Sequence, residues 1–446
     1  MNYERGCVHT QPCLSMKDMK YTQALEYIEN INRIKGSVMG LKSIRSLCEE
    51  LNNPQDKLKF VHIAGTNGKG STLAFVSTIL KESGYRVGRY ISPTIRQYRE
   101  RFQVNAKIIS QTMFCELLEK VKTACDSMVE RGLEHPTAFE IETALAFLFF
   151  EKKGCDIVVL ETGMGGIDDA TNVVNTTVLS ILTSISMDHM QFLGDTIEKI
   201  TQKKCGIIRS GVPVVSSNND ERVVNVIKEN CRKMQSSIAF LDNDSITQIK
   251  GSLSKQSFKY NKIKYEIRLS GTWQIQNAAL AVMASNALNE AGFKKINEES
   301  IKKGLLLTEW PARFQTVSKR PLIIIDGAHN EGAALRLRES IDMYLSDKKH
   351  IYIMGMFRDK EVDKVVSTIV KDGVMVFTCQ APNNPRAMRP VELAEVVRKY
   401  NPGVTCCDSV DEALEFATAM CDEDTAIIAC GSLAYLGRIL DIFNPL

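Results

Sequence analysis

The sequence lacks any CxxC pair, and this absence bears on both metal sites and disulfides. Its 13 cysteines are scattered over 446 residues, with Cys406-Cys407 as an adjacent pair, and its 6 histidines are dispersed rather than set at ligand spacing. Structural zinc is therefore not expected. A chain of this length can bury enough apolar surface without disulfides, so we expect reduced thiols.

The sequence also lacks a long apolar run and a strong charge of either sign. Its longest apolar stretch, Ala144–Phe150, is far shorter than the roughly 20 residues of a membrane helix. The first residues, MNYERGCVHTQP, carry charge and no apolar segment, which argues against a secretory signal. Lys and Arg total 56 against 53 Asp and Glu, so the formal charge of +3 supplies no broad field to gather nucleic acid. We expect a cytoplasmic protein that binds neither membrane nor nucleic acid.

The composition is that of an ordinary globular protein, with 44% hydrophobic and 24% charged residues, and the length suits two domains. Short β-branched runs alternate with helical patterns almost throughout, which is typical of parallel sheets covered by helices on both faces. In the first part of the chain this pattern predicts strands at Phe60–Ala64, Val87–Ile91, Asp156–Glu161, Thr177–Leu182 and Val212–Ser216. It predicts helices between them at Gly70–Lys81, Thr137–Glu151 and Thr196–Ile208. The predicted fold class is α/β, with a doubly wound N-terminal domain.

The pattern changes after Ile246. The polar, alternating stretch from there to Leu269 predicts a small hairpin sheet, and a helix is expected at Gln274–Ala291. Trp310-Pro311 then interrupts the chain before a second strand–helix series. The strands predicted in this series are Leu322–Ile325, Ile351–Met354, Val374–Thr378 and Ala426–Ala429. We therefore expect two domains, residues 1–308 and 309–446, with ligand sites in the cleft between them.

The strongest local signal is the segment KFVHIAGTNGKGSTLAFVSTIL, an apolar strand, a loop with glycines at 65, 68 and 70, and a helix. Glycines let backbone N–H groups approach phosphate oxygens, and Lys69 can bridge the terminal phosphates, with Ser71 placed for Mg²⁺. The strict GxxxxGK[ST] pattern is not met, because Ile63 replaces its first glycine and Gly70 follows Lys69. A glycine-rich turn with an incidental lysine is the alternative. The predicted nucleotide-binding residues are Thr66, Asn67, Gly68, Lys69, Gly70, Ser71 and Thr72.

A phosphate loop alone does not reveal what attacks the γ-phosphate. The chain has no HRD or DFG segment, which argues against a protein kinase, and no GTPase-like base-recognition motif follows the loop. A motor driven by hydrolysis remains open on this evidence.

Further motifs follow the loop in order: DIVVLETGMGG, DATNVVN, ILTSISMDHMQFLGDTIEKIT and DGAHN. With GLKSIRSLCEELNNPQ before the loop and GSLAYLGRIL near the end, the chain resembles the folylpolyglutamate synthase/dihydrofolate synthase family of the Mur ligase superfamily almost end to end. The resemblance implies an N-terminal P-loop ATPase domain and a C-terminal Rossmann-like domain that closes over the substrates. It also implies ATP-dependent conversion of a carboxylate into an acyl phosphate, which the amine of L-glutamate attacks to form an amide.

The resemblance implies that Ser71, Ser92, Glu161 and His189 bind Mg²⁺ or contact its ligands, an oxygen-rich set with one imidazole. Glu161 ends the apolar run DIVVLE, where a strand delivers its side chain to the carboxyl edge of the sheet; a solvated glutamate is the alternative. For His189 the alternative is a structural histidine.

Lys204 matches a lysine that is carbamylated in related ligases and then acts as a metal ligand, a reaction that needs a deprotonated amine. The family usually has Glu where Lys203 stands, so a surface lysine beside Lys203 is the alternative. With Lys204, the expected catalytic residues are Lys69 and His189.

By the same resemblance, Asn277, Arg313, Asp326 and His329 complete the ATP site. Arg313 lies at the linker, where it would contact phosphate only when the domains close. A linker arginine in a salt bridge is the alternative.

The acceptor site is where the chain departs from the family. The residues implied there are Thr137, Phe139, Glu140, Asp168, Asp169 and Ala170, with Gly40 nearby. The family commonly has SPHL and GGRLDATN where this chain has SPTI and GGIDDATN, so a histidine and an arginine are lost. Dihydropteroate and a reduced folate therefore both remain open as acceptors. Three hypotheses follow for a monomeric protein: a bifunctional synthase, a monofunctional synthase or relative acting on another carboxylate, and a silent ATP-binding protein.

Overall fold

The computed structural model describes residues 19–36, 38–382 and 384–445. Residues 1–12, from which we predicted that the chain has no secretory signal, lie outside the described residues. Cys7 and Cys13 also lie outside them. The other cysteines are free thiols, as predicted. Every helix within the described ranges is too short or too polar to span a bilayer.

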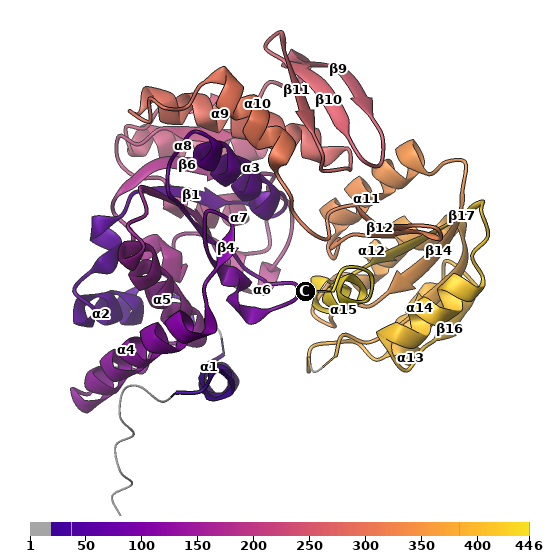
Figure 1. Ribbon diagram of the computed structural model, residues 1–446, viewed down its shortest axis with the longest axis horizontal. Helices are drawn as coiled ribbons and strands as arrows, with labels where there is room; N and C mark the ends of the chain where they lie inside the picture. Colours follow the sequence, from indigo (N-terminus) through magenta and orange to yellow (C-terminus); the bar gives the residue numbers. More distant parts are fainter. Residues whose placement is uncertain (1–18, 37, 383, 446) are drawn as a thin grey trace, which may run out of the picture.

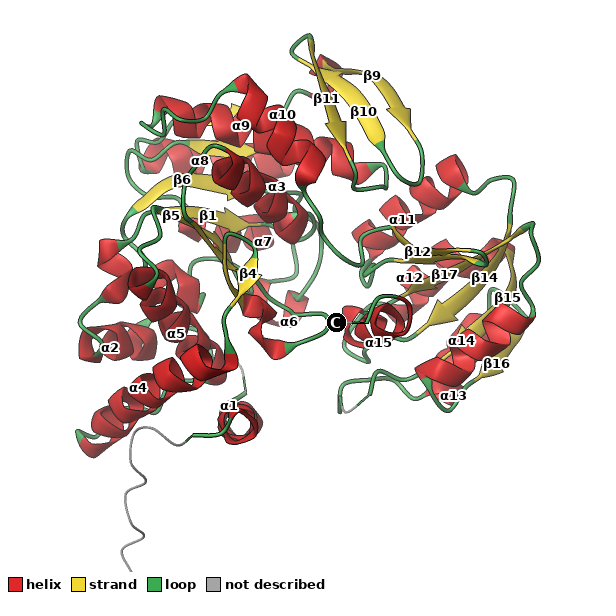
Figure 2. Ribbon diagram, viewed as in Figure 1, coloured by secondary structure: helices red, strands yellow, loops and turns green. Residues whose placement is uncertain are grey.

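The first half of the chain forms an eight-stranded sheet in the order β4-β3-β2-β5-β1-β6-β7-β8 (Figures 1 and 2). Its strands are β1 Phe60–Ala64, β2 Val87–Tyr90, β3 Phe102–Val104, β4 Lys107–Ile108, β5 Ile157–Glu161, β6 Thr177–Leu182, β7 Val214–Ser216 and β8 Ile238–Phe240. The predicted parallel arrangement is confirmed from β2 to β8, whereas β3 and β4 pair antiparallel at one edge. The segment 91–101 between β2 and β3 is too short for the helical crossover that a parallel pair requires.

Helices cover both faces of this sheet, because alternate residues of the buried strands point to opposite sides. On one face α1, α2, α4 and α5 pack on side chains such as Phe60 and Val158. On the other face α3, α9 and α10 pack on Val61 and Val159. The helices of this half are α1 Tyr21–Lys35, α2 Lys42–Glu50, α3 Lys69–Glu82, α4 Gln111–Glu130, α5 Ala138–Lys152, α6 Met190–Leu193, α7 Ile197–Lys204, α8 Glu221–Lys233, α9 Trp273–Glu290 and α10 Glu298–Leu307.

A small antiparallel sheet, in the order β11-β10-β9, precedes α9 and confirms the predicted hairpin region. Its strands are β9 Ile246–Gly251, β10 Gln256–Tyr260 and β11 Ile263–Ile267. In Figure 1 it projects from the first half toward the second.

The second half is a six-stranded sheet in the order β12-β13-β17-β14-β15-β16, parallel except for β12. Its strands are β12 Gln315–Lys319, β13 Leu322–Ile325, β14 Lys349–Met354, β15 Gly373–Thr378, β16 Val404–Cys406 and β17 Thr425–Cys430. The helices α11 Glu331–Tyr344, α12 Val362–Ile369 and α13 Pro390–Arg398 cover one face, and α14 Val410–Ala419 and α15 Leu433–Phe443 the other. The two sheets lie side by side in Figure 1, joined by the segment 308–314. The domain boundary predicted at 308/309 falls in this segment and stays a prediction.

Candidate active site

The phosphate loop connects the central strand β1 to α3. Gly68 has φ +86°, and a Cβ there would lie 2.6 Å from Asn277 Oδ1, so only glycine fits. A Cβ on Gly70 would lie 2.8 Å from the ring of Trp310. The glycines thus let α9 and the interdomain linker pack directly against the loop.

The loop hydroxyls are buried beneath a pair of amides. Ser71 accepts a hydrogen bond from Gln274 Nε2 at 3.2 Å, and Asn277 Nδ2 donates to Gln274 Oε1 at 3.1 Å. Thr72 is fully buried on the same turn. The structure thus brings Asn277 to the phosphate loop, through a glutamine that the sequence motifs did not single out.

Lys69 and Glu161 face each other across the carboxyl edge of the sheet. Lys69 Nζ donates to the Thr66 carbonyl at 3.2 Å and lies 4.0 Å from Glu161 Oε1. The backbone of Ser92 lies beside the Glu161 carboxylate, and both residues line the same cleft. Burial raises the pKa of Glu161 to about 7, although Lys69 and Arg313 oppose the shift. Ser92, Glu161 and Lys69 therefore share one site.

Lys204 lies below the loop at the end of α7. Its Nζ donates to the Gly65 carbonyl at 2.8 Å. Burial, and then the nearby Lys69 ammonium, lower the pKa of Lys204 to about 7, so a large part of its amine is neutral at neutral pH. This is the state that carbamylation requires.

His189 follows β6 and precedes α6. Its φ of +50° is left-handed, which is uncommon for a residue with a side chain. Burial lowers its pKa to about 4, and the cations Lys360, Lys69 and Lys204 act in the same direction, against Asp188. The imidazole is therefore neutral at neutral pH and keeps a lone pair for a metal.

The linker and the end of β13 supply Arg313, Asp326 and His329. The one hydrogen bond of the Arg313 side chain within the described residues is to the Ala312 carbonyl, at 2.9 Å. Burial raises the pKa of Asp326 to about 6 despite Arg313, and its oxygens accept from the Phe314 and Ala328 amides, both at 2.8 Å. Burial lowers the pKa of His329 to about 4. Its Nδ1 lies 2.8 Å from the Gly327 carbonyl, which can only accept, so Nδ1 carries the proton.

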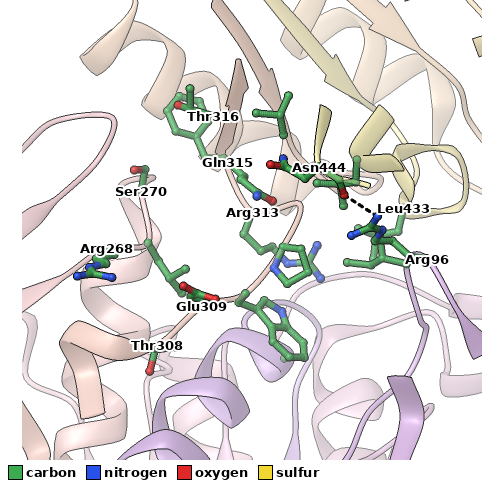
Figure 3. Close-up of a pocket in the computed structure, with 18 of the residues that line it drawn as sticks. Arg96, Arg268, Ser270, Thr308, Glu309, Arg313, Gln315, Thr316, Leu433 and Asn444 are labelled. Carbon is green, nitrogen blue, oxygen red and sulfur yellow. Dashed lines mark hydrogen bonds between the residues drawn. The ribbon is translucent and has the colours of Figure 1, made fainter. Parts of the chain in front are cut away.

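A cleft of 1410 Å³ lies between the two sheets, and Gly70, Ser92, Glu161 and Arg313 line it. Figure 3 shows Arg313 extending into this cleft from the linker, toward Arg96. Arg96 crosses the cleft to α15, where it contacts Asp441 and donates to the Asn444 carbonyl, each at 2.7 Å. These four predicted residues thus line one cleft between the two halves, and their role in binding stays a prediction.

A second polar contact between the halves was not predicted. Asn67 and Asn330 exchange hydrogen bonds at 3.2 Å. Asn330 Nδ2 also donates to Asp188 at 3.0 Å, and Lys360 Nζ donates to the same carboxylate at 2.9 Å. Asn330 ends the motif DGAHN and Asp188 precedes His189, so both stood next to predicted residues. Lys360 had no signal in the sequence beyond its charge.

The predicted acceptor residues near α5 are largely engaged with their own backbone. Thr137 caps α5, and Glu140 accepts from both Thr137 N and Thr137 Oγ1, at 2.7 and 2.9 Å. Glu140 also accepts from Ile44 N at 3.1 Å, which ties α5 to α2. Phe139 is half-buried, packed against Gly163 and Tyr90. Phe139 is thus the member of this group with an accessible surface.

The loop 163–170 carries the other predicted acceptor residues. Asp169 is buried and accepts from Met164 N at 2.8 Å and from the amide and hydroxyl of Thr171. Asp168 is partly exposed and pairs with Lys203 at 2.6 Å, while Ala170 is buried. The Gly40 amide donates to the Asp168 carbonyl at 3.1 Å. The roles of all these residues in acceptor binding stay predictions.

Among the described residues, no three or more His, Cys, Asp or Glu side chains lie close enough to hold a metal ion by themselves. Ser71, Glu161 and a neutral His189 are oxygen and nitrogen donors at the phosphate loop, a set that fits Mg²⁺ when nucleotide phosphates and water complete its shell.

Comparisons with known proteins give a consistent result. The family model "Mur ligase middle domain" matches residues 63–285, and "Mur ligase, glutamate ligase domain" matches residues 312–433. A dihydrofolate synthase/folylpolyglutamate synthase of Bacillus subtilis (strain 168) is 32% identical over 429 residues, covering 94% of this chain and 98% of the relative. A folylpolyglutamate synthase of Lacticaseibacillus casei is 31% identical over 377 residues, covering 83% and 87%. The solved structure of Mycobacterium tuberculosis folylpolyglutamate synthase complexed with ADP has a TM-score of 0.87 at 25% identity, covering 95% of this chain and 99% of that one.

Proposed function

Since the chain belongs to the folylpolyglutamate synthase/dihydrofolate synthase family of Mur ligases, we propose that it uses ATP to join L-glutamate to a folate-type carboxylate. The observation that carries the proposal is the meeting of Lys69, Glu161 and Ser92 with Arg313 at one cleft between the two sheets. Such a cleft can hold a triphosphate and a carboxylate together, which is the central demand of the reaction.

ATP would lie with its phosphates on the loop 65–72. The loop amides and Lys69 would neutralise the β- and γ-phosphates, and Arg313 has donors left for phosphate because its one hydrogen bond within the described residues is to a carbonyl. A bound Mg²⁺, held by Ser71, Glu161 and His189 with Ser92 nearby, would supply further positive charge at the phosphates. Asn277 and Asp326 complete the nucleotide side of the proposed site, with His329 beside it.

The first chemical step would be attack of an acceptor carboxylate oxygen on the γ-phosphorus, which breaks the bond to ADP and gives an acyl phosphate. The glutamate amine then attacks the acyl carbon, inorganic phosphate leaves, and the amine gives up a proton. Lys69 and Arg313 stabilise the negative charge that moves during both steps. Closure of the cleft keeps water from the acyl phosphate.

Lys204 is proposed as a site of carbamylation. A neutral amine and CO₂ give a carbamate and a proton. The negatively charged carbamate would then lie near the Gly65 carbonyl and close to Lys69. The low pKa of Lys204 supports this proposal because it supplies the neutral amine.

The acceptor is proposed to be dihydropteroate, a reduced folate, or both. Phe139 and the loop 163–170 are the proposed acceptor contacts. Asp168, which adds a negative charge relative to the family pattern GGRLDATN, is paired with Lys203. A monomeric, cytoplasmic enzyme remains our expectation.

The test is an acceptor panel. Purified protein with Mg-ATP and L-glutamate is given dihydropteroate, tetrahydrofolate or a tetrahydrofolate that already carries glutamates, and ADP and the amide product are measured by mass spectrometry. We expect ADP and product in equal amounts with at least one acceptor. No product with any of them would exclude a folate ligase, and product formation by Lys69→Ala at the wild-type rate would exclude the proposed site.

A further inference from the structure

Two ion pairs join the two sheets within the described residues, and they differ in burial. Arg96 pairs with Asp441, whose side chain is 42% exposed, whereas Lys360 and Asp188 are only 8% and 11% exposed. The Lys360–Asp188 pair also lies next to His189, at the phosphate loop. A pair this deeply buried is costly to break, because removing one partner leaves the other charge without compensation.

The Asp188 carboxylate accepts three hydrogen bonds. Oδ1 accepts from Lys360 Nζ at 2.9 Å and from the His189 backbone N–H at 2.9 Å. Oδ2 accepts from Asn330 Nδ2 at 3.0 Å. Two of these three donors, Lys360 and Asn330, come from the second sheet and its loops. The carboxylate therefore links the second half of the chain directly to the backbone of His189.

The backbone of His189 needs such support. Its φ of +50° is left-handed, and a non-glycine residue keeps this conformation only when its surroundings hold it there. The helix that follows, α6, has four residues and gives little support of its own. The Phe192 and Leu193 amides donate to the His189 carbonyl, so the helix starts from this strained residue.

We propose that Lys360 is a positioning residue: through Asp188 it holds His189 and the start of α6 beside the phosphate loop, and only while the two halves are closed on each other. The proposal rests on the proposed ligase function for its catalytic consequence. Lys360 itself need not touch substrate. It makes the placement of a proposed metal ligand depend on closure, so ATP would be used only in the closed protein.

The experiment compares wild type with Lys360→Gln, Asp188→Asn, the double variant and Lys360→Arg. Lys364→Gln is the matched control, because Lys364 lies on the neighbouring helix α12, is itself exposed and pairs with the partly exposed Glu331 and Glu361. Three experiments are made on full-length protein: steady-state kinetics, which give kcat and KM for ATP with a productive acceptor, binding of a non-hydrolysable ATP analogue, and hydrogen exchange of the amides of residues 189–194.

We expect Lys360→Gln to lower kcat about 100-fold and to change analogue binding less than about 3-fold, because the phosphate loop itself stays intact. The double variant should lose no more activity than either single variant, since both remove the same contact. Lys360→Arg should recover most of the loss. Exchange at 189–194 should rise in Lys360→Gln and stay unchanged in Lys364→Gln.

The proposal would be overturned if the kcat losses of the two single variants multiplied in the double variant. It would also be overturned if hydrogen exchange at residues 189–194 were unchanged in Lys360→Gln. If the wild type makes no product with any acceptor, the proposed function fails. The positioning role is then decided by the exchange measurement, which needs no acceptor. A global loss of stability would raise exchange in α3 as well, so α3 serves as the internal reference for a local effect.

Discussion

Lys69 is the residue whose loss should be most damaging to catalysis at the least cost to the fold. Among the residues that the structure describes, its ammonium donates one hydrogen bond, to the Thr66 carbonyl, and lies 4.0 Å from Glu161. Lys69→Ala is expected to lower kcat/KM for ATP on the order of 10²–10³-fold, because a charge aimed at the transferring phosphoryl group is lost. Lys81→Ala, at the other end of α3 and 42% exposed, is the control and should retain activity. Comparable losses in both variants would show that α3, rather than the Lys69 charge, is responsible.

Glu161 should show a conflict between stability and function. Its folded pKa of about 7 lies above the ordinary glutamate value of 4.5, so between these values the folded protein holds a proton that the unfolded chain has lost. Stability therefore falls as pH rises through this window. Above pH 7 wild type must bury an ionised carboxylate. We expect Glu161→Gln, measured in EDTA, to be roughly 2–3 kcal/mol more stable than wild type at pH 8 and about equal at pH 4.5, yet inactive.

Calorimetric melting at both pH values is the measurement, and Glu142→Gln is an informative comparison because Glu142 is equally buried but paired with Arg101 and Tyr98. That variant should be less stable than wild type at both pH values. Equal stability of wild type and Glu161→Gln at pH 8 would contradict the raised pKa.

At the scale of elements, α15 and the loop 92–101 should behave as one unit. A Cβ on Gly437 of α15 would lie 2.1 Å from the Ile95 carbonyl, so the helix touches the loop backbone at this glycine. Glu100 holds the loop by accepting from the Ile95 amide at 2.8 Å. Ser92, at the start of the loop, lies beside Glu161 in the cleft. We expect Gly437→Ala to destabilise the protein by about 1–3 kcal/mol and to lower kcat, because the loop must move.

Arg438→Ala, on the same helix and paired with exposed Asp411, is the control. It should change stability by less than about 0.5–1 kcal/mol and leave kcat unchanged. Thermal melting and steady-state kinetics of the two variants decide the matter, and equal effects would mean that α15 as a whole, not its contact with the loop, was disturbed.

The elements that could be predicted from the sequence are those buried on both faces. The run FVHIA of β1 is apolar at nearly every position, and its bounds matched the prediction. In contrast β4 has two residues and β8 three half-exposed or exposed ones, which leaves too few positions for a pattern. The edge strand β12, which is antiparallel, was missed for a related reason, because its side chains are mostly half-buried.

The residues of the candidate site also divide into those that the sequence could predict and those that it could not. Lys69 and Glu161 could be placed from the sequence because Glu161 ends β5 and Lys69 begins the helix that follows β1, and parallel topology brings both positions to one edge of the sheet. Lys360 could not, since its partner Asp188 lies far away in the chain and the two meet only through the arrangement of the two sheets. Gln274 is similar: it lies one helical turn before the predicted Asn277, and only the packing of α9 on α3 shows that it reaches Ser71.

At the scale of the whole molecule, the two sheets are linked at few points, so a ligand in the cleft should change how they unfold. If ATP binds the phosphate loop and Arg313 together, Mg-ATP at about 100 times its Kd should stabilise the wild type by roughly 2.7 kcal/mol and raise the melting of both halves together. The reason is that neither half can unfold without losing the ligand.

Arg313→Ala should uncouple the unfolding of the two halves. Arg313 comes from the linker beside the second sheet, and without it the nucleotide keeps contacts mainly with the loop 65–72. We expect differential scanning calorimetry of this variant to show two transitions, of which Mg-ATP raises only the one that belongs to the eight-stranded sheet. Arg320→Ala, an exposed position in the same half, should behave like wild type. A single transition that Mg-ATP raises equally in Arg313→Ala and wild type would mean that other contacts, such as Asn67 with Asn330, are sufficient to couple the halves.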